Sequence, residues 1–218
     1  MGNLTERLIQ TAQTLERLGL STVGPAKGSC SVRDDESGFV YLTPSGKPFS
    51  ELTPSMLVKV DLEGNRFSEG KPSVDFIFHR AIYKARSDIK CIIHLHSPYA
   101  TAFAVCRREI PVHMQAIANT VGYPIPIADF ALPGTEKLGE NIVRAMAGKI
   151  NAALMANHGI VACGATPEEA LHVADTVETG AQVSFIATLM GSPIALTQEE
   201  VDGARGFYAS AFLGGDKK

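Results

Sequence analysis

Short apolar stretches alternate with helical patterns along this chain, and that alternation limits the folds open to it. Most neighbouring stretches are joined by segments that look too short for the crossover of about a dozen residues that parallel strands need. The chain is therefore predicted to form an α/β sandwich, with a mostly antiparallel central sheet and helices on both faces. The expected strands are residues 30–33, 39–42, 58–62, 90–95, 125–128, 152–156 and 160–163.

Helix start and stop signals divide much of the remaining chain. From residue 4 to 18 apolar side chains recur at helical spacing, and Gly19 follows as a stop. Thr166 is followed by a proline at the first helical position and by a capping-box glutamate, which predicts a helix to about Met190. Further helices are expected over 72–85, from Pro98, from Thr135 and from Thr197.

Composition excludes several classes of protein. The chain has 218 residues, of which 45% are hydrophobic and 20% charged, and no repeat or linker divides it. Residues 1–218 are therefore predicted to form a single domain. A net charge of −3 predicts no general affinity for nucleic acid or anionic membranes. No apolar stretch reaches the roughly 20 residues of a membrane span. The first residues do not show the basic and apolar pattern of a secretory leader, so none is expected.

The cysteines indicate a compartment. There are four, and none of them shows a CxxC spacing. Most lie in apolar stretches, so we expect reduced, buried thiols of a cytoplasmic protein. They are Cys30, Cys91, Cys106 and Cys163.

Two histidines one residue apart carry the strongest chemical signal. His94 and His96 end an apolar stretch, and residues i and i+2 of a strand point to the same face. Two such imidazoles can share one metal ion. The alternative is a polar strand end with two surface histidines. The metal interpretation is favoured because ligand sites in open α/β sheets lie at strand ends of this kind.

A third imidazole is needed for a typical catalytic zinc site, and His158 is the best candidate. It interrupts apolar sequence between Asn157 and Gly159, at an expected tight turn. The alternative is an ordinary turn residue. His79 and His172 fall in helical patterns, which favours structural roles, and His113 has no informative spacing.

A carboxylate near the metal is expected at Asp75, in the first turn of the helix expected over 72–85. The helix dipole and the unpaired N–H groups there favour an anion. Ordinary helix capping is the alternative interpretation. Two small, hydroxyl-rich turns, at residues 28–31 and 43–46, could let backbone N–H groups approach an oxyanion.

Five segments together resemble the class II aldolase/adducin family. They are Gly28–Arg33, Thr43–Gly46, Pro72–Asp75, His94–Ser97 and Ala156–Gly159, in matching order and spacing. The resemblance implies one divalent metal per subunit, commonly zinc with manganese or cobalt as alternatives, bound by His94, His96 and His158. It implies an acid/base role for Asp75 and a homotetramer whose sites lie between subunits. Tyr208 would enter a neighbour's site, and Gly28, Ser29, Ser45, Gly46 and Ser73 would hold the anionic end of a small-molecule substrate.

The chain departs from the aldolase pattern at four positions. Ser29 stands where that pattern has asparagine, Val74 where it has serine, Asp75 where it has glutamate, and Gln115 where it has tyrosine. Val74 offers no hydrogen-bonding side chain. We therefore expect weaker phosphate binding and a different proton donor to the departing aldehyde.

These features predict a metal-dependent carbon–carbon lyase. Three neutral histidines leave the metal ion its charge and open positions, which suit retro-aldol cleavage of a sugar or sugar-phosphate-like hydroxy ketone through an enediolate. Decarboxylation of a keto acid uses the same electron sink and is the first alternative, and 4-epimerisation is the second. A non-enzymatic, adducin-like interaction module would not need three histidines at these places.

Overall fold

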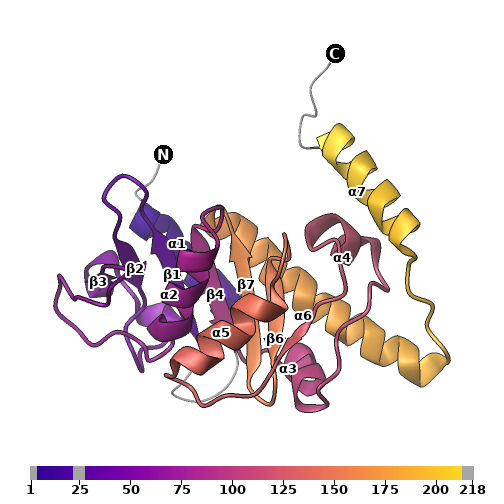
Figure 1. The fold of residues 1–218 in the computed structure, drawn as a ribbon, viewed down its shortest axis with the longest axis horizontal. Helices are drawn as coiled ribbons and strands as arrows, with labels where there is room; N and C mark the ends of the chain where they lie inside the picture. The colour runs from indigo at the N-terminus through magenta and orange to yellow at the C-terminus, as the bar shows by residue number, and fades with distance from the viewer. Residues whose placement is uncertain (1–3, 22–27, 213–218) are drawn as a thin grey trace.

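The computed structural model describes residues 4–21 and 28–212. Within that part of the chain, one seven-stranded sheet has the order β3-β2-β1-β4-β7-β6-β5 (Figure 1). Only β5 and β6 pair in parallel, so the predicted mostly antiparallel α/β architecture is confirmed. The strands are β1 (Ser29–Arg33), β2 (Val40–Leu42), β3 (Val58–Val60), β4 (Cys91–Leu95), β5 (Ile127–Ala128), β6 (Ala152–Met155) and β7 (Gly159–Gly164).

Helices cover both faces of the sheet. One apolar core lies under α1 (Leu4–Arg17), α3 (Pro98–Val105), α4 (Gln115–Thr120) and α6 (Pro167–Met190). The other lies under α2 (Phe76–Ala85) and α5 (Glu136–Ala145), which pack against each other in front of the sheet in Figure 1. Helix α7 (Gln198–Phe212) leaves the body beside α4.

The central strand β4 explains why two cores form. Ile93 and Leu95 pack into the first core, whereas Ile92 packs into the second. This alternation follows from the two-residue period of a strand. Because helices cover both faces, β4 is buried along its whole length and has no polar residue before His94.

The predicted helix starts on the C-terminal side of the chain are confirmed. The Thr166 hydroxyl accepts from the Glu169 N–H at 3.1 Å. At α7 the capping box is reciprocal, because Thr197 caps the Glu200 N–H while the Glu200 carboxylate accepts from the Thr197 N–H at 2.7 Å. Among the described residues, no helix combines the length and the apolar character needed to cross a membrane.

Two expectations about the fold were wrong in detail, and one helix was not predicted at all. Helix α2 begins at Phe76, four residues later than expected, because Pro72 forms a β-bridge with Pro44 and stays extended. Helix α4 had no cap signal in the sequence, and indeed its N-cap residue makes no side-chain capping bond. Cys106 is exposed at the end of α3, unlike the other three cysteines, which are buried and free.

Candidate metal centre and active site

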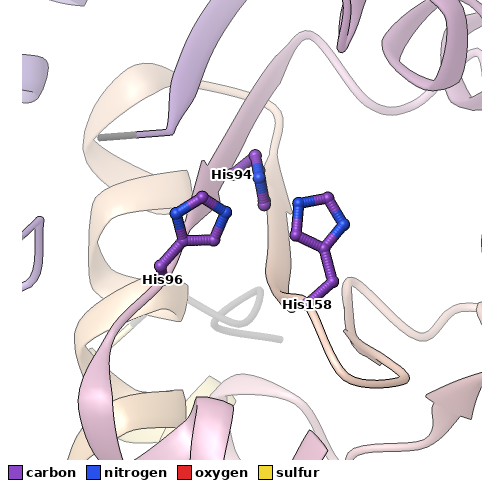
Figure 2. Close-up of side chains that lie close together, drawn as sticks. All are labelled: His94, His96 and His158. Carbon is purple, nitrogen blue, oxygen red and sulfur yellow. The ribbon is translucent and has the colours of Figure 1, made fainter. Parts of the chain in front are cut away.

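The fold brings three histidines together from two places in the chain. His94 is on β4, His96 follows it, and His158 lies in the turn between β6 and β7. Because β4 pairs with β7, that turn comes to the end of β4. Figure 2 shows the three rings facing one another, and one ring nitrogen from each lies within 4.8 Å of the others. The structure thus assembles the predicted ligand set.

The turn that carries His158 is fixed by its neighbours. Asn157 has a left-handed backbone with φ of +58°, which asparagine tolerates better than most residues. Its N–H donates to the Ala104 carbonyl of α3 at 3.0 Å, and its side-chain oxygen accepts from Arg107 at 3.0 Å. These bonds join the turn to the helix that directly follows His96.

Gly28 lies against the backbone of His94. Its φ is +102°, and a Cβ on it would come within 2.1 Å of the His94 carbonyl oxygen. A side chain at position 28 would push β1 away from β4 at the metal cluster. Position 28 therefore accepts only glycine, because the backbones of Gly28 and His94 lie too close together for a side chain.

The electrostatics of the cluster fit a divalent cation. The His94 Nδ1 contacts the Ile160 carbonyl at 2.8 Å, so this nitrogen donates and Nε2 is left as the ligand atom. Burial lowers the pKa of His94 well below its ordinary value, and burial with the neighbouring His96 charge lowers the pKa of His158. Both imidazoles are therefore neutral at neutral pH, which is the form that binds metal.

Asp75 lies beside the cluster. It occupies the N-cap position of α2, but its side chain makes no capping bond. Burial opposes ionisation of this carboxyl, which is only 9% exposed. The rings of His94 and His79 and hydrogen bonds from Ser29 and Ser73 nevertheless lower its pKa. The Asp75 charge in turn raises the pKa values of His94 and His158, against the effect of burial. The carboxylate therefore faces the histidines instead of the helix.

The predicted anion-binding residues fall into two groups. The bridge between Pro44 and Pro72 places the turn holding Ser45 and Gly46 beside the segment holding Ser73, and the Ser45 N–H donates to the Lys71 carbonyl at 3.2 Å. Ser45 and Gly46 are exposed and Ser73 is half-buried. Val74, next to Ser73, is 54% exposed.

Ser29 differs from this group. It is fully buried, and its hydroxyl lies 3.0 Å from His79 Nε2. In addition, it hydrogen-bonds the Asp75 carboxylate.

Tyr208 is not part of the histidine cluster in this chain. It lies on α7, which packs against α4 and extends away from the end of β4 (Figure 1). Gln115 is the first residue of α4.

The sequence interpretation gave His79 only a structural role and did not name Glu178, and both are buried polar residues. His79 lies one turn after Asp75 on α2, and this i, i+4 spacing was the signal that could have found it. Glu178 of α6 accepts from the N–H groups of Tyr99 and Ala100, both at 2.9 Å, and so caps α3 from another helix. No local pattern predicts that contact.

The comparison with known proteins settles the family. Residues 6–185 match the class II aldolase and adducin N-terminal domain, which is well over half of the chain. This chain belongs to the class II aldolase and adducin family. It is 35% identical over 198 residues to the L-fuculose phosphate aldolase of Escherichia coli, covering 90% of this chain and 89% of that protein.

Two further similar proteins agree with the family assignment. The 3-oxo-tetronate 4-phosphate decarboxylase of Haemophilus influenzae is 34% identical over 203 residues, covering 90% of this chain and 93% of that protein. A solved L-fuculose 1-phosphate aldolase superimposes with a TM-score of 0.89 at 32% identity, over 95% of this chain and 97% of that one. With its cluster of three histidines, the chain is an enzyme of the metal-dependent class II aldolase type.

Proposed function

We propose that this enzyme cleaves a carbon–carbon bond of a small phosphorylated hydroxy ketone by a retro-aldol reaction. The observation that carries the proposal is the cluster of His94, His96 and His158 with the Asp75 carboxylate beside it. The relatives named above act on sugar phosphates or a related keto acid phosphate. The site and the two relatives together support a lyase of this kind.

The histidines are proposed to hold one divalent ion, with zinc as our first choice because three nitrogen ligands suit zinc with one open position. Bound there, the ion supplies a Lewis acid for adjacent carbonyl and hydroxyl oxygens. Ile160 fixes the His94 ring through its Nδ1. Manganese and cobalt are alternatives that metal analysis of the purified protein distinguishes.

Asp75 is proposed to move the proton. In cleavage, the substrate hydroxyl that becomes the aldehyde loses its proton as the carbon–carbon bond breaks. The electron pair of that bond stays on the ketone fragment, whose carbon must then take a proton. A general acid or base works from within hydrogen-bond reach of that carbon's proton, and Asp75 is the carboxylate beside the histidines. Its lowered pKa means that it begins as the base in the direction of carbon–carbon bond formation.

The anionic end of the substrate is proposed to bind between the turn holding Ser45 and Gly46 and the segment holding Ser73. Backbone N–H groups of Gly28 and Gly46 are proposed to approach it, since neither residue carries a side chain. Ser29 was part of the predicted set, and we keep it as a contributor through the Asp75 carboxylate that it hydrogen-bonds.

We propose a homotetramer with Tyr208 reaching a neighbour's site. The C-terminal end of α6 and the following residues expose apolar side chains that a second copy of the chain would cover. Leu189 is 72% exposed, and the others are Phe185, Ile186, Met190 and Ile194. Light scattering should give about four times 23.2 kDa, and full activity at the single-chain mass would contradict this arrangement. With three buried free thiols, we propose a cytoplasmic location.

Decarboxylation of a keto acid is the second candidate. It is favoured by Gln115, which stands where the aldolase pattern has a tyrosine, and by the similarity to the decarboxylase. Losing carbon dioxide requires the same electron sink, but no hydroxyl has to lose a proton to become an aldehyde. Gln115, which replaces the tyrosine, then does not need to act on an aldehyde.

The test is a substrate screen of the metal-loaded protein. L-fuculose 1-phosphate, 3-oxo-tetronate 4-phosphate and their unphosphorylated counterparts are compared, with aldehyde and carbon dioxide measured separately. Aldehyde release from a ketose phosphate supports the aldolase proposal. Carbon dioxide release without aldehyde would replace it with the decarboxylase, and inactivity of an Asp75→Asn variant is expected in either case.

A further inference from the structure

A continuous line of buried polar side chains runs from the sheet interior to Asp75. The Tyr83 hydroxyl lies 2.8 Å from the Ser31 hydroxyl, which lies 2.7 Å from His79 Nδ1. On the other side of the ring, His79 Nε2 lies 3.0 Å from the Ser29 hydroxyl, and Ser29 hydrogen-bonds Asp75. Tyr83, Ser31, His79 and Ser29 are each at most 1% exposed.

The direction of these hydrogen bonds follows from the charge at one end. An ionised carboxylate only accepts, so the Ser29 hydroxyl must donate its single proton to Asp75. The Ser29 oxygen then accepts from His79, which places the ring proton on Nε2. Burial lowers the pKa of His79 to about 4, so at neutral pH the ring has one proton and Nδ1 is an acceptor.

The remaining two residues complete the same direction. Since Nδ1 accepts, the Ser31 hydroxyl donates to it, and its oxygen is left to accept from Tyr83. The Tyr83 hydroxyl also lies 3.1 Å from the Ser31 carbonyl, but sharing its proton leaves the direction at His79 unchanged. Ser31, His79 and Ser29 thus each donate toward Asp75.

We propose that His79 is a positioning residue that acts through the Ser29 hydroxyl to hold the Asp75 carboxylate toward the three histidines. This inference rests on the proposed acid/base role of Asp75. His79 and Asp75 lie one turn apart on α2, and Ser29 is directly opposite His94 in the pairing of β1 with β4. The same serine therefore joins the carboxylate to the strand that carries the metal ligands.

A purely structural role for the line predicts a different result. If His79 only filled the core, any residue of similar volume that satisfied its neighbours would serve. In the proposed role the group at the Nε2 position must donate. Without that donor the Ser29 proton is no longer directed to Asp75, and losing this hydrogen bond to a charged group costs roughly 10- to 100-fold. Here the loss falls on the proton-transfer step.

A matched pair of variants separates the two ring nitrogens. In His79→Gln the amide nitrogen can occupy the place of Nε2 and donate to Ser29, whereas in His79→Asn the shorter amide reaches only the place of Nδ1. On the substrate found in the screen, we expect His79→Asn to lower kcat roughly 10- to 100-fold with KM and metal content unchanged. His79→Gln should recover most of that loss, and equal kcat values for the two variants would overturn the proposal.

A second measurement needs no turnover. Nitrogen NMR of the zinc-loaded protein, labelled with ¹⁵N-histidine, reports which ring nitrogen of His79 carries the proton, with Ser29→Ala used to assign the signal. We expect the proton on Nε2, and a proton on Nδ1 would overturn the proposal even if no substrate were found. Failure of the proposed acid/base role of Asp75 gives a different result from failure of the proposal for His79. Asp75→Asn would then keep full activity, while the ring proton of His79 would remain on the same nitrogen.

Discussion

Gly159 lies directly against His96. A Cβ on Gly159 would come within 2.8 Å of Cδ2 of the His96 ring and 2.3 Å of the Leu95 carbonyl oxygen. The residue after one proposed ligand therefore sets the position of another.

A methyl group at this position should disturb the metal site. We expect Gly159→Ala to weaken metal binding by about 10-fold or more, as loss of a ligand-orienting contact typically does. Titration with zinc, followed by competition with a chelator, measures the change. Gly203→Ala in α7 is the control, because nothing lies within 4 Å of a Cβ there. Unchanged zinc affinity in Gly159→Ala would show that the His96 ring does not depend on this contact.

Asp75→Asn should separate catalysis from folding. Asparagine has nearly the same size, and its amide oxygen can still accept from Ser73, so the free energy of unfolding and the metal content should change little. Turnover should fall by at least about 10²-fold, because an amide cannot take the proton. Steady-state kinetics and metal analysis test this, with the exposed Asp175 of α6, changed to Asn, as the control. An active Asp75→Asn variant would move the acid/base role to another residue.

Val74→Ser should strengthen binding of a phosphorylated substrate. The side chain is 54% exposed and lies between Ser73 and Asp75, so a hydroxyl there adds a donor beside the proposed anion site. A hydrogen bond to a charged group is worth about 1.5–3 kcal/mol, or roughly 10- to 150-fold in affinity. Binding of a phosphorylated and an unphosphorylated substrate is compared, and only the first should tighten. If neither does, Val74 does not face the anion.

The buried His79 should make stability depend on pH. Its pKa is about 4 in the folded chain and about 6.5 in an unfolded one, so between these values the unfolded state binds more protons. The free energy of unfolding should therefore fall as the pH is lowered from about 6.5 to about 4, by about 2 kcal/mol between pH 7 and pH 5. Urea unfolding of the metal-free protein, compared with His79→Gln, isolates this contribution. An equally steep pH dependence in the variant would contradict it.

The sequence was informative where chemistry follows from local spacing. The two-residue period of a strand predicted that His94 and His96 lie together, which they do although β4 ends at Leu95. The cap at Thr166 located the start of α6. His158 comes close to His94 and His96 only because β4 pairs with β7. His94 and Ile160, which meet in this pairing, are 66 residues apart in the sequence, and no local pattern predicts such a contact. The resemblance of five ordered segments supplied that link.

The polar network behind Asp75 could not be predicted in the same way. A single histidine in an amphipathic helix indicates only a helix face, and the partners of His79 come from β1. Asp75 was expected in the first turn of a helix, but the bridge between Pro44 and Pro72 makes α2 begin only at Phe76. The Asp75 carboxylate then lies toward Ser29 and Ser73. Both features arise from contacts between segments that are distant in sequence.

Metal stoichiometry tests the central claim most directly. Wild-type protein and a variant with His94, His96 and His158 all changed to alanine are loaded with zinc, freed of excess by gel filtration and analysed for metal by mass spectrometry. The three-histidine site predicts one ion per subunit in the wild type and almost none in the variant. Full metal occupancy in the triple variant would contradict the account.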